Sequence, residues 1–413
     1  MPRTSFELRE SRWSRNIGSL APLVQAFADH LAAADYRAYT VTRLAESARH
    51  FCVWLRVSNV PPANVDDDVV GRFAHHRCHC PGRQRRNPSI SRYVTRRVRQ
   101  FARFLAGTGA SPPRAREASD PRIEMYLDWM RVHRGLTENT MRTRGAVLQK
   151  LLPALGDDSA AYDAYLVRQV ILDISRTHSR SYVQTAASAL RCYLRFLISR
   201  NECRPDLEFA VPSMAGWRSS SLPRYLPAEK IEALVASCNR PTPAGIRDRA
   251  IILLLCRLGL RAGDVLHLQL GDIEWDQGTL RVCGKSRREV RLPLPQDAGD
   301  ALLNYLNGAR PNVASDRVFL RSLPPFRPFS SHATVSKIVD IELARAGITD
   351  APSRGAHLLR HSAATAMLRT GATLETIGSV LRHRSIDTTV HYAKVDILAL
   401  HQIAQPWPGE ASC

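Results

Sequence analysis

The stretch HLLRHSAATAMLRTGATLETIGSVLRHRSIDTTVHY, residues 357–392, has polar residues spaced so that several of them meet at one point. His357 and Arg360 stand three residues apart, so they share one face of a predicted helix. Gly371 predicts the end of that helix, and Thr373 predicts the N-cap of the next one. Polar residues at the ends of successive short helices predict a functional site here as well as a core.

The second of these helices is predicted to end near His383, and Tyr392 follows nine residues later, after a possible helix cap at residues 387–389. The pattern resembles the C-terminal signature of the tyrosine recombinases, the phage integrase family. In that family the order is His-x-x-Arg-His, Leu-Gly-His, Thr-Thr and a nucleophilic Tyr. The matching residues here are His357, Arg360, His361, Leu381, His383, Thr388, Thr389 and Tyr392. The chain departs at Arg382, where the family usually has a helix-ending Gly, and Arg takes that place at modest cost.

A second cluster lies upstream, within residues 247–295. Arg261 follows Gly259 and Leu260, and Asp264 comes three residues later. Two strands, residues 279–283 and 289–294, are predicted around a turn that contains Lys285. Arg261, Asp264 and Lys285 resemble the first catalytic arginine of the family, its supporting acid and its hairpin lysine. Two clusters in the right order make the resemblance specific over about residues 225–400, whereas the N-terminal half matches only loosely.

The resemblance implies DNA cleavage without a metal, by a tyrosine that forms a covalent 3′-phosphotyrosine. Tyr392 is the candidate nucleophile, and cationic neighbours would help a phenol of ordinary pKa about 10 to lose its proton. Arg261 and Arg360 suit a clamp on the non-bridging phosphate oxygens, because a guanidinium is planar and stays charged.

Lys285 is placed to protonate the leaving 5′ oxygen, His357 suits proton transfer, and His383 suits a hydrogen bond to the phosphate. Asp264 is expected to hold its neighbours in place, and His361 is assigned a structural role. Taken singly, such residues are more often core tyrosines, capping histidines or surface arginines. Their joint order and spacing favours the catalytic interpretation.

With 413 residues, the chain is long enough for two or three domains, and a net charge of +20 points to a polyanionic partner, most simply DNA. A solvated basic surface without a partner is the alternative. The nine Cys are scattered, which is typical of a reduced intracellular protein. The N-terminus lacks an apolar signal core, and the longest apolar run is too short to span a membrane. We therefore expect a cytoplasmic protein without membrane contact.

The expected fold is mainly α and multidomain, with helical-bundle DNA-binding domains and a mixed α/β catalytic domain that contains a small β-hairpin sheet. The predicted divisions are an N-terminal helical domain at 1–110, a core-binding helical domain at 118–205, a linker at 206–224 and a catalytic domain at 225–413. A Gly/Pro-rich break at residues 107–113 marks the first boundary. Several positions of the second domain echo the first, which leaves a tandem duplication open.

Residues 89–105 have helical spacing, with Tyr93, Val98 and Phe101 among the residues on the apolar side. The opposite face is predicted to contact DNA through Arg92, Arg96, Arg99 and Arg103, and the hairpin turn through Arg287 and Arg288. Just upstream, residues 75–80 read HHRCHC. Such closely alternating His and Cys do not predict one tetrahedral site, and no second Cys-x-x-Cys completes it, so no metal is expected.

The favoured function is site-specific DNA strand exchange by an integrase, resolvase or transposon recombinase, plausibly of a mobile element. The resemblance implies that subunits act as a homotetramer on double-stranded DNA, with no cofactor and possible accessory proteins. One alternative is a type IB topoisomerase-like enzyme, against which two N-terminal bundles and an integrase-like tail argue. Another is a non-catalytic DNA-binding relative, which the full set of catalytic residue types disfavours.

Overall fold

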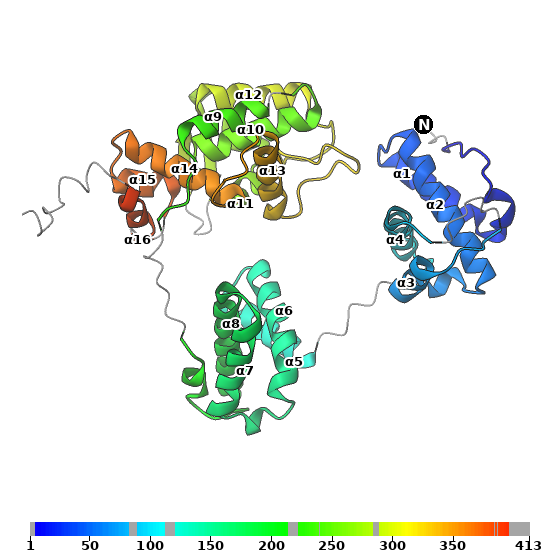
Figure 1. The fold of residues 1–413 in the computed structure, drawn as a ribbon, viewed down its shortest axis with the longest axis horizontal. Coiled ribbons are helices and arrows are strands. Elements are labelled where there is room, and N and C mark those ends of the chain that lie inside the picture. The colour runs from blue at the N-terminus through cyan, green and yellow to red at the C-terminus, as the bar shows by residue number, and fades with distance from the viewer. Residues whose placement is uncertain are drawn as a thin grey trace, which may run out of the picture. The chain divides into compact units, whose positions relative to one another are not determined.

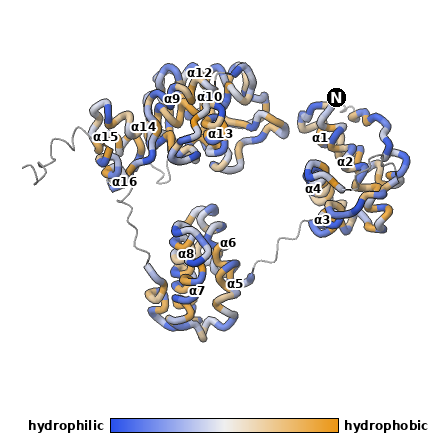
Figure 2. The backbone as a smooth tube through the Cα atoms, in the orientation of Figure 1, coloured by the Kyte–Doolittle hydropathy of each residue, from blue (hydrophilic) through white to orange (hydrophobic). Residues whose placement is uncertain are grey.

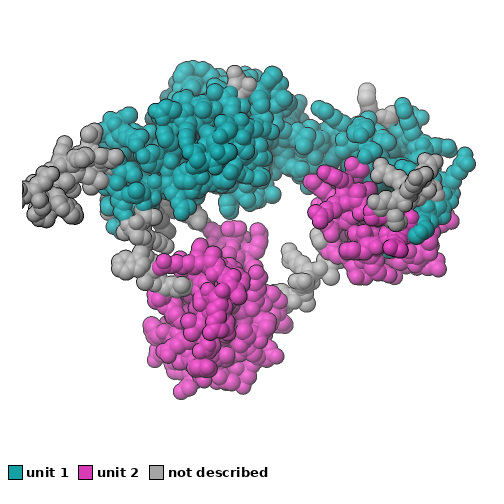
Figure 3. Space-filling model, viewed as in Figure 1, with its two compact units in different colours: residues 1–54, 79–86, 218–413 teal, residues 55–78, 87–217 magenta. Residues whose placement is uncertain are grey.

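A computed structural model of the chain describes residues 5–81, 89–111, 120–213, 222–238, 240–283, 289–383, 385 and 387–395. This part of the chain is mostly helical with one small antiparallel sheet, as predicted (Figure 1). It forms two compact units, one of residues 1–54, 79–86 and 218–413 and the other of residues 55–78 and 87–217 (Figure 3). No helix in the described ranges is both long enough and apolar enough to cross a membrane.

The N-terminal helices begin where the sequence offers caps. They are α1 (Ala21–Ala33), α2 (Ala38–Val57), α3 (Asp67–His75) and α4 (Arg92–Gly107). The Asp66 side chain accepts a hydrogen bond from the Val69 amide at the start of α3, and Ser91 accepts one from Val94 at the start of α4. α3 packs against α4.

α4 has one apolar and one basic face, as its spacing predicts. Val98, Phe101 and Leu105 are buried, whereas all four arginines of the predicted stripe are exposed: Arg92, Arg96, Arg99 and Arg103. The placement of Tyr93 on the apolar side was wrong, because its side chain is 74% exposed. Tyr93 lies in the first turn of the helix, at the edge of the apolar face, where no neighbouring element has to cover it.

The next four helices share one core: α5 (Pro121–Arg134), α6 (Glu138–Leu155), α7 (Ala164–Thr177) and α8 (Arg180–Ser199). Figure 2 shows both hydrophobic and hydrophilic positions along these helices. Tyr126 of α5 lies edge-on to Tyr193 of α8, with ring centroids 5.5 Å apart. Leu207 and Val211 also join this core, so its packing continues past residue 205.

The C-terminal region has a second core around α10 (Pro243–Arg257), which is buried almost along its whole length. α10 packs against α12 (Gln296–Gly308) and α14 (Ala356–Arg369), and α9 (Ala228–Ser237), α11 (Ala262–His267) and α13 (His332–Arg345) complete the helical layer. The sheet has the order β1 (Ile273–Glu274), β2 (Thr279–Cys283) and β3 (Glu289–Pro293). β2 pairs antiparallel with β3, with Cys283 opposite Glu289, so the predicted hairpin is present.

The stretch around residues 357–392 forms α14, α15 (Leu374–Leu381), α16 (Asp387–Val390) and a short 3₁₀ turn, His391–Val395. Both predicted helix signals are confirmed. Gly371 has φ +89° just after α14, and the Thr373 side chain accepts a hydrogen bond from the Thr376 amide at the start of α15. Ala364, Ile377, Leu381 and Tyr392 form a small apolar cluster of their own.

Candidate active site

The site is built around Gly259, at the junction between α10 and α11. Its φ is +61°, and a Cβ at this position would lie 2.5 Å from a methyl carbon of Leu381. Only glycine accommodates both the left-handed backbone and this close approach. Arg360 of α14 then ties the junction down, because its Nη1 donates to the Gly259 carbonyl at 2.5 Å and its Nη2 donates to the Leu381 carbonyl.

Hydrogen bonds of Arg261 and Arg382 join the start of α11 to the end of α15. The Arg261 Nη2 donates to the Arg382 carbonyl at 3.0 Å. The Arg382 Nη2 donates in turn to Asp264 Oδ2, which also accepts from the Arg261 amide at 2.8 Å. Arg382 itself ends α15 in the left-handed region, with φ +56°, where Gly was expected. Asp264 therefore fixes both arginines.

Three guanidinium groups crowd into this space, those of Arg261, Arg360 and Arg382. Burial, and then the charge of Arg261, lowers the pKa of Arg360 to about 9. Burial and the charge of Arg382 also lower the pKa of Arg261. The Arg382 side chain is only 7% exposed, and within the described ranges its Nε and Nη1 have no hydrogen-bond acceptor. A cationic cluster with buried donors left over is suited to an anion.

The candidate nucleophile lies under this cluster. Tyr392 is 1% exposed, and its Oη lies 2.7 Å from Nδ1 of His361. Burial raises the pKa of Tyr392, while the charge of Arg360 acts in the opposite direction. His383 Nδ1 lies 2.7 Å from Thr389 Oγ1, and the rings of His383 and Tyr392 are nearly parallel with centroids 6.3 Å apart.

The histidines of the site are held neutral at neutral pH. Burial, and then the charge of His357, lowers the pKa of His361 to about 4. Burial, and then the charge of Arg360, lowers the pKa of His383 to about 4. The pKa of His357 is lowered by burial and by Arg360 as well. A neutral His361 that carries its proton on Nε2 accepts a hydrogen bond from the Tyr392 hydroxyl through Nδ1, which orients the phenol.

Residues 224–397 match the model of the phage integrase family. A putative integrase/recombinase of Sinorhizobium fredii, y4rA, is 35% identical over 404 residues, which cover 95% of this chain and 96% of that protein. The chain belongs to the phage integrase family. The tyrosine recombinase XerD of Lacticaseibacillus casei is 26% identical over 292 residues, which cover 69% of the integrase-family chain and 98% of XerD.

Solved structures of integrases share the fold. A lambda integrase dimer (residues 75–356) bound to a COC′ core site aligns with a TM-score of 0.52 at 15% identity, over 70% of this chain and 96% of that one. The Tn1549 transposon integrase in complex with a circular intermediate DNA aligns with the same TM-score at 14% identity, over 68% and 99%. Together with the family match, these similarities confirm the predicted recombinase family and fold class.

The structure of this integrase-family chain brings together the predicted site residues that it describes: Arg261, Asp264, His357, Arg360, His383 and Tyr392. Lys285, Arg287 and Arg288 lie outside the described residues.

Two residues, His361 and Arg382, make contacts in this site that the sequence prediction did not include. His361 was given a structural role but contacts the candidate nucleophile, and its position one helical turn after His357 is the signal that could have shown this. Arg382 was taken as a helix end, although a cation at this motif position could have suggested a phosphate contact.

Proposed function

We propose that this member of the phage integrase family is a site-specific recombinase that breaks and rejoins DNA strands through a 3′-phosphotyrosine at Tyr392. The observation that carries the proposal is the cluster of three guanidiniums around the carboxylate of Asp264, beside a buried tyrosine. Because the three guanidiniums outnumber the Asp264 carboxylate, the buried cluster has excess positive charge, and a bound anion would lower its electrostatic free energy. A phosphodiester supplies that anion, and its charge increases as the transition state forms.

In the proposed reaction, Tyr392 Oη attacks the phosphorus and the bond from phosphorus to the 5′ oxygen breaks. The 5′ oxygen leaves with a proton, for which Lys285 is the candidate donor, while neutral His357 is suited to accept a proton. Rejoining is the reverse, with a 5′ hydroxyl as attacking group and Tyr392 as leaving group. Arg261 and Arg360 stabilise the non-bridging oxygens in both directions, so the energy of the broken bond is kept in the covalent intermediate.

Arrival of the phosphate also changes the acid–base properties of the site. The pKa of His361 is depressed by burial and by nearby positive charge, so a bound anion acts against part of that depression. His361 then becomes a better acceptor for the proton of Tyr392. Because Tyr392 is 1% exposed and hydrogen-bonded to His361, its ring has to be uncovered for attack. DNA binding is the event proposed to uncover it.

Double-stranded DNA is the proposed partner, with homotetramers assembling on it. The exposed arginine stripe of α4 supports a phosphate-backbone contact in the N-terminal domain, 1–110. The bundle α5–α8 corresponds to the proposed core-binding domain, and residues 225–413 to the catalytic domain. The aligned lambda integrase is bound to a COC′ core site and the aligned Tn1549 integrase to a circular intermediate DNA, which is consistent with this assignment.

A covalent trapping assay tests the proposal. The full chain is mixed with nicked duplexes made from DNA that flanks its gene, and a denaturant-resistant protein–DNA band is sought in the presence of a chelator. We expect a band that disappears in Tyr392→Phe and persists in Tyr165→Phe, a control tyrosine that is 71% exposed on α7. A band that survives Tyr392→Phe would show that another residue is the nucleophile. Salt-sensitive binding without any band on either flank would favour a non-catalytic DNA-binding protein.

A further inference from the structure

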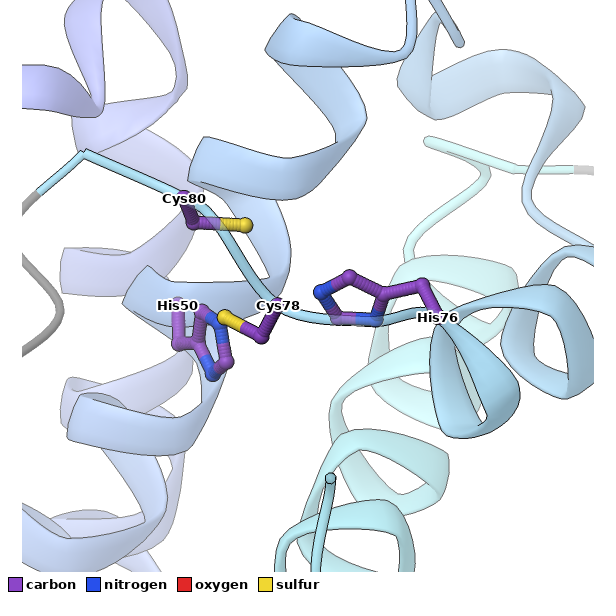
Figure 4. A group of neighbouring side chains, drawn as sticks. All are labelled: His50, His76, Cys78 and Cys80. Atoms are coloured by element: carbon purple, nitrogen blue, oxygen red, sulfur yellow. The ribbon is translucent and has the colours of Figure 1, made fainter. Parts of the chain in front are cut away.

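Four side chains in the N-terminal domain have the composition of a metal site. The ligand atoms of His50, His76, Cys78 and Cys80 all lie within 4.8 Å of one another, and Figure 4 shows the four side chains turned toward a common point. His50 comes from α2, and the other three residues follow the end of α3. His50, Cys78 and Cys80 are 6%, 4% and 5% exposed. This is a cluster in the interior of the protein.

The backbone explains how three closely spaced residues reach one point. His76 ends α3 with φ −67° and ψ 142°, and the segment continues without helix through residue 80. In an extended chain, alternate residues face the same side. Accordingly Cys78 and Cys80 are buried and His76 is partly buried, while the intervening Arg77 and His79 are exposed. The sequence alone predicted no metal here, because such closely alternating His and Cys cannot all reach one tetrahedral ion and no second Cys-x-x-Cys pair is present. The cluster in the structure instead takes its fourth residue, His50, from α2.

The two imidazoles are held in place by contacts outside the cluster. Nδ1 of His76 lies 2.5 Å from the Phe73 carbonyl, which can only accept, so Nδ1 carries the proton and Nε2 keeps its lone pair. Metal-binding histidines are commonly oriented in this way, by a carbonyl that accepts from the other ring nitrogen. The ring of His50 stacks on Trp13, with centroids 4.2 Å apart and planes within 13°. Both rings are thus fixed before any metal arrives.

We propose that His50, His76, Cys78 and Cys80 bind one structural Zn²⁺ ion. Two thiolates and two imidazoles are a donor set that zinc prefers, and two thiolates neutralise its charge. Tetrahedral bonds to zinc place ligand atoms about 3.4–3.8 Å apart, so only small side-chain movements are needed to bring atoms that lie within 4.8 Å of one another onto an ion. Four protein ligands leave no open position, so the ion holds structure and performs no chemistry. It fastens the segment after α3 to α2.

Metal analysis of the full chain, purified without a polyhistidine tag, tests this. We expect about one zinc per chain by mass spectrometry under native conditions, and a loss of that zinc in Cys78→Ser and Cys80→Ser. The matched controls are Cys203→Ser, a half-buried thiol of the α5–α8 core, and His79→Gln, in the same segment but exposed. Both controls should retain the zinc. Zinc-free wild-type protein, or zinc retained in both ligand variants, would overturn the proposal.

Cobalt substitution guards against variants that fail to fold. The wild-type chain is stripped of metal and titrated with Co²⁺, whose tetrahedral thiolate complexes give intense visible and near-ultraviolet bands. We expect these bands to saturate at about one Co²⁺ per chain and to be displaced by Zn²⁺. Absence of thiolate–cobalt bands in the folded wild-type chain would show that the cluster holds no such ion. DNA cleavage is not the readout, so this result stands apart from the catalytic proposal.

Discussion

Arginine is used in two opposite ways in this molecule. In the candidate active site the Arg360 residue is 5% exposed and the Arg382 side chain 7% exposed, and each binds groups from distant parts of the chain. On α4 the arginines of the stripe are all exposed: Arg92, Arg96, Arg99 and Arg103. The buried guanidiniums are therefore held in place by acceptors of the protein, whereas the exposed ones face solvent.

Because of this difference in burial, we expect substitutions of the buried arginines and of the exposed α4 arginines to have different effects. Buried, oriented donors act on a charge that develops in the transition state, so their loss lowers the rate of the chemical step. Exposed cations act through release of counterions from the DNA, so their loss weakens binding and its salt dependence. A single arginine variant that changes both the rate of the chemical step and the salt dependence of DNA binding would contradict this division.

Arg360→Lys should give the largest effect of an arginine substitution. Lysine keeps the charge but cannot donate to the Gly259 and Leu381 carbonyls while also holding a phosphate in a fork. We expect the single-turnover rate of covalent adduct formation at saturating DNA to fall by about 10²–10³-fold. DNA affinity should change little.

Arg249→Lys is the matched control for Arg360→Lys, because Arg249 also donates to a backbone carbonyl, that of Val235, in the same core region. Its adduct rate should equal that of the wild type. If Arg360→Lys keeps the wild-type rate as well, Arg360 is only a structural clamp. Thermal unfolding of both variants separates a lost rate from a lost fold.

Arg382→Gly restores the residue that the motif usually has, and it sharpens the comparison at a single position. Glycine removes the cost of about 1 kcal/mol for a left-handed non-glycine residue, but the substitution leaves the buried Asp264 carboxylate without this ion pair, so we expect the melting temperature to fall. It also removes the third guanidinium, so the adduct rate should fall about tenfold, equivalent to about 1.4 kcal/mol of transition-state stabilisation. Arg382→Asn tolerates the same backbone without the charge and should show the same loss of rate. A more stable variant with an unchanged rate would limit Arg382 to ending α15.

Features that depend on a few neighbouring residues were predictable from the sequence. Gly371 and Thr373 set helix ends through their own backbone preferences, and the strand β2 (Thr279–Cys283) has the predicted bounds. Each depends on a few neighbouring residues only. The exposed face of α4 was predictable for the same reason, since helical spacing alone determines which residues share a face.

Contacts between distant segments were not predictable. The ion pair of Arg382 with Asp264 joins residues 118 positions apart, and it depends on how α15 meets α11. The hydrogen bond of His361 to Tyr392 depends likewise on how the chain returns after α16. Sequence spacing does not contain the packing of helices that sets these distances. The same reason hid His50 from the His/Cys segment that it joins.

Arg99→Gln tests the exposed side of the comparison. We expect DNA affinity to fall a few-fold, with the slope of log affinity against log salt reduced by about 0.9 for one lost phosphate contact. The adduct rate at saturating DNA should not change. Arg72→Gln is the control, because Arg72 is exposed on α3 but already pairs with Asp68 at 3.2 Å. A loss of adduct rate at saturating DNA in Arg99→Gln would place α4 in the chemistry and end the division between the two sets.

Lowering the pH should reduce the free energy of unfolding through the buried histidines of the candidate active site, and the exposed arginines of α4 should not contribute to this effect. The pKa of His383 is about 4 in the folded chain, below the unfolded value near 6.5, because burial and the charge of Arg360 oppose its protonation. Between these values the unfolded chain binds more protons, so the free energy of unfolding falls as pH drops from about 6.5 towards 4. His383→Asn keeps a hydrogen-bond acceptor for Thr389 but cannot titrate, so its stability should fall less over the same range. Denaturant unfolding at several pH values measures the difference, and His133→Asn, exposed on α5, should follow the wild type. An equal loss in His383→Asn and wild type would mean that the arginine cluster does not keep this imidazole neutral, and that the buried guanidiniums are screened much as the exposed ones are.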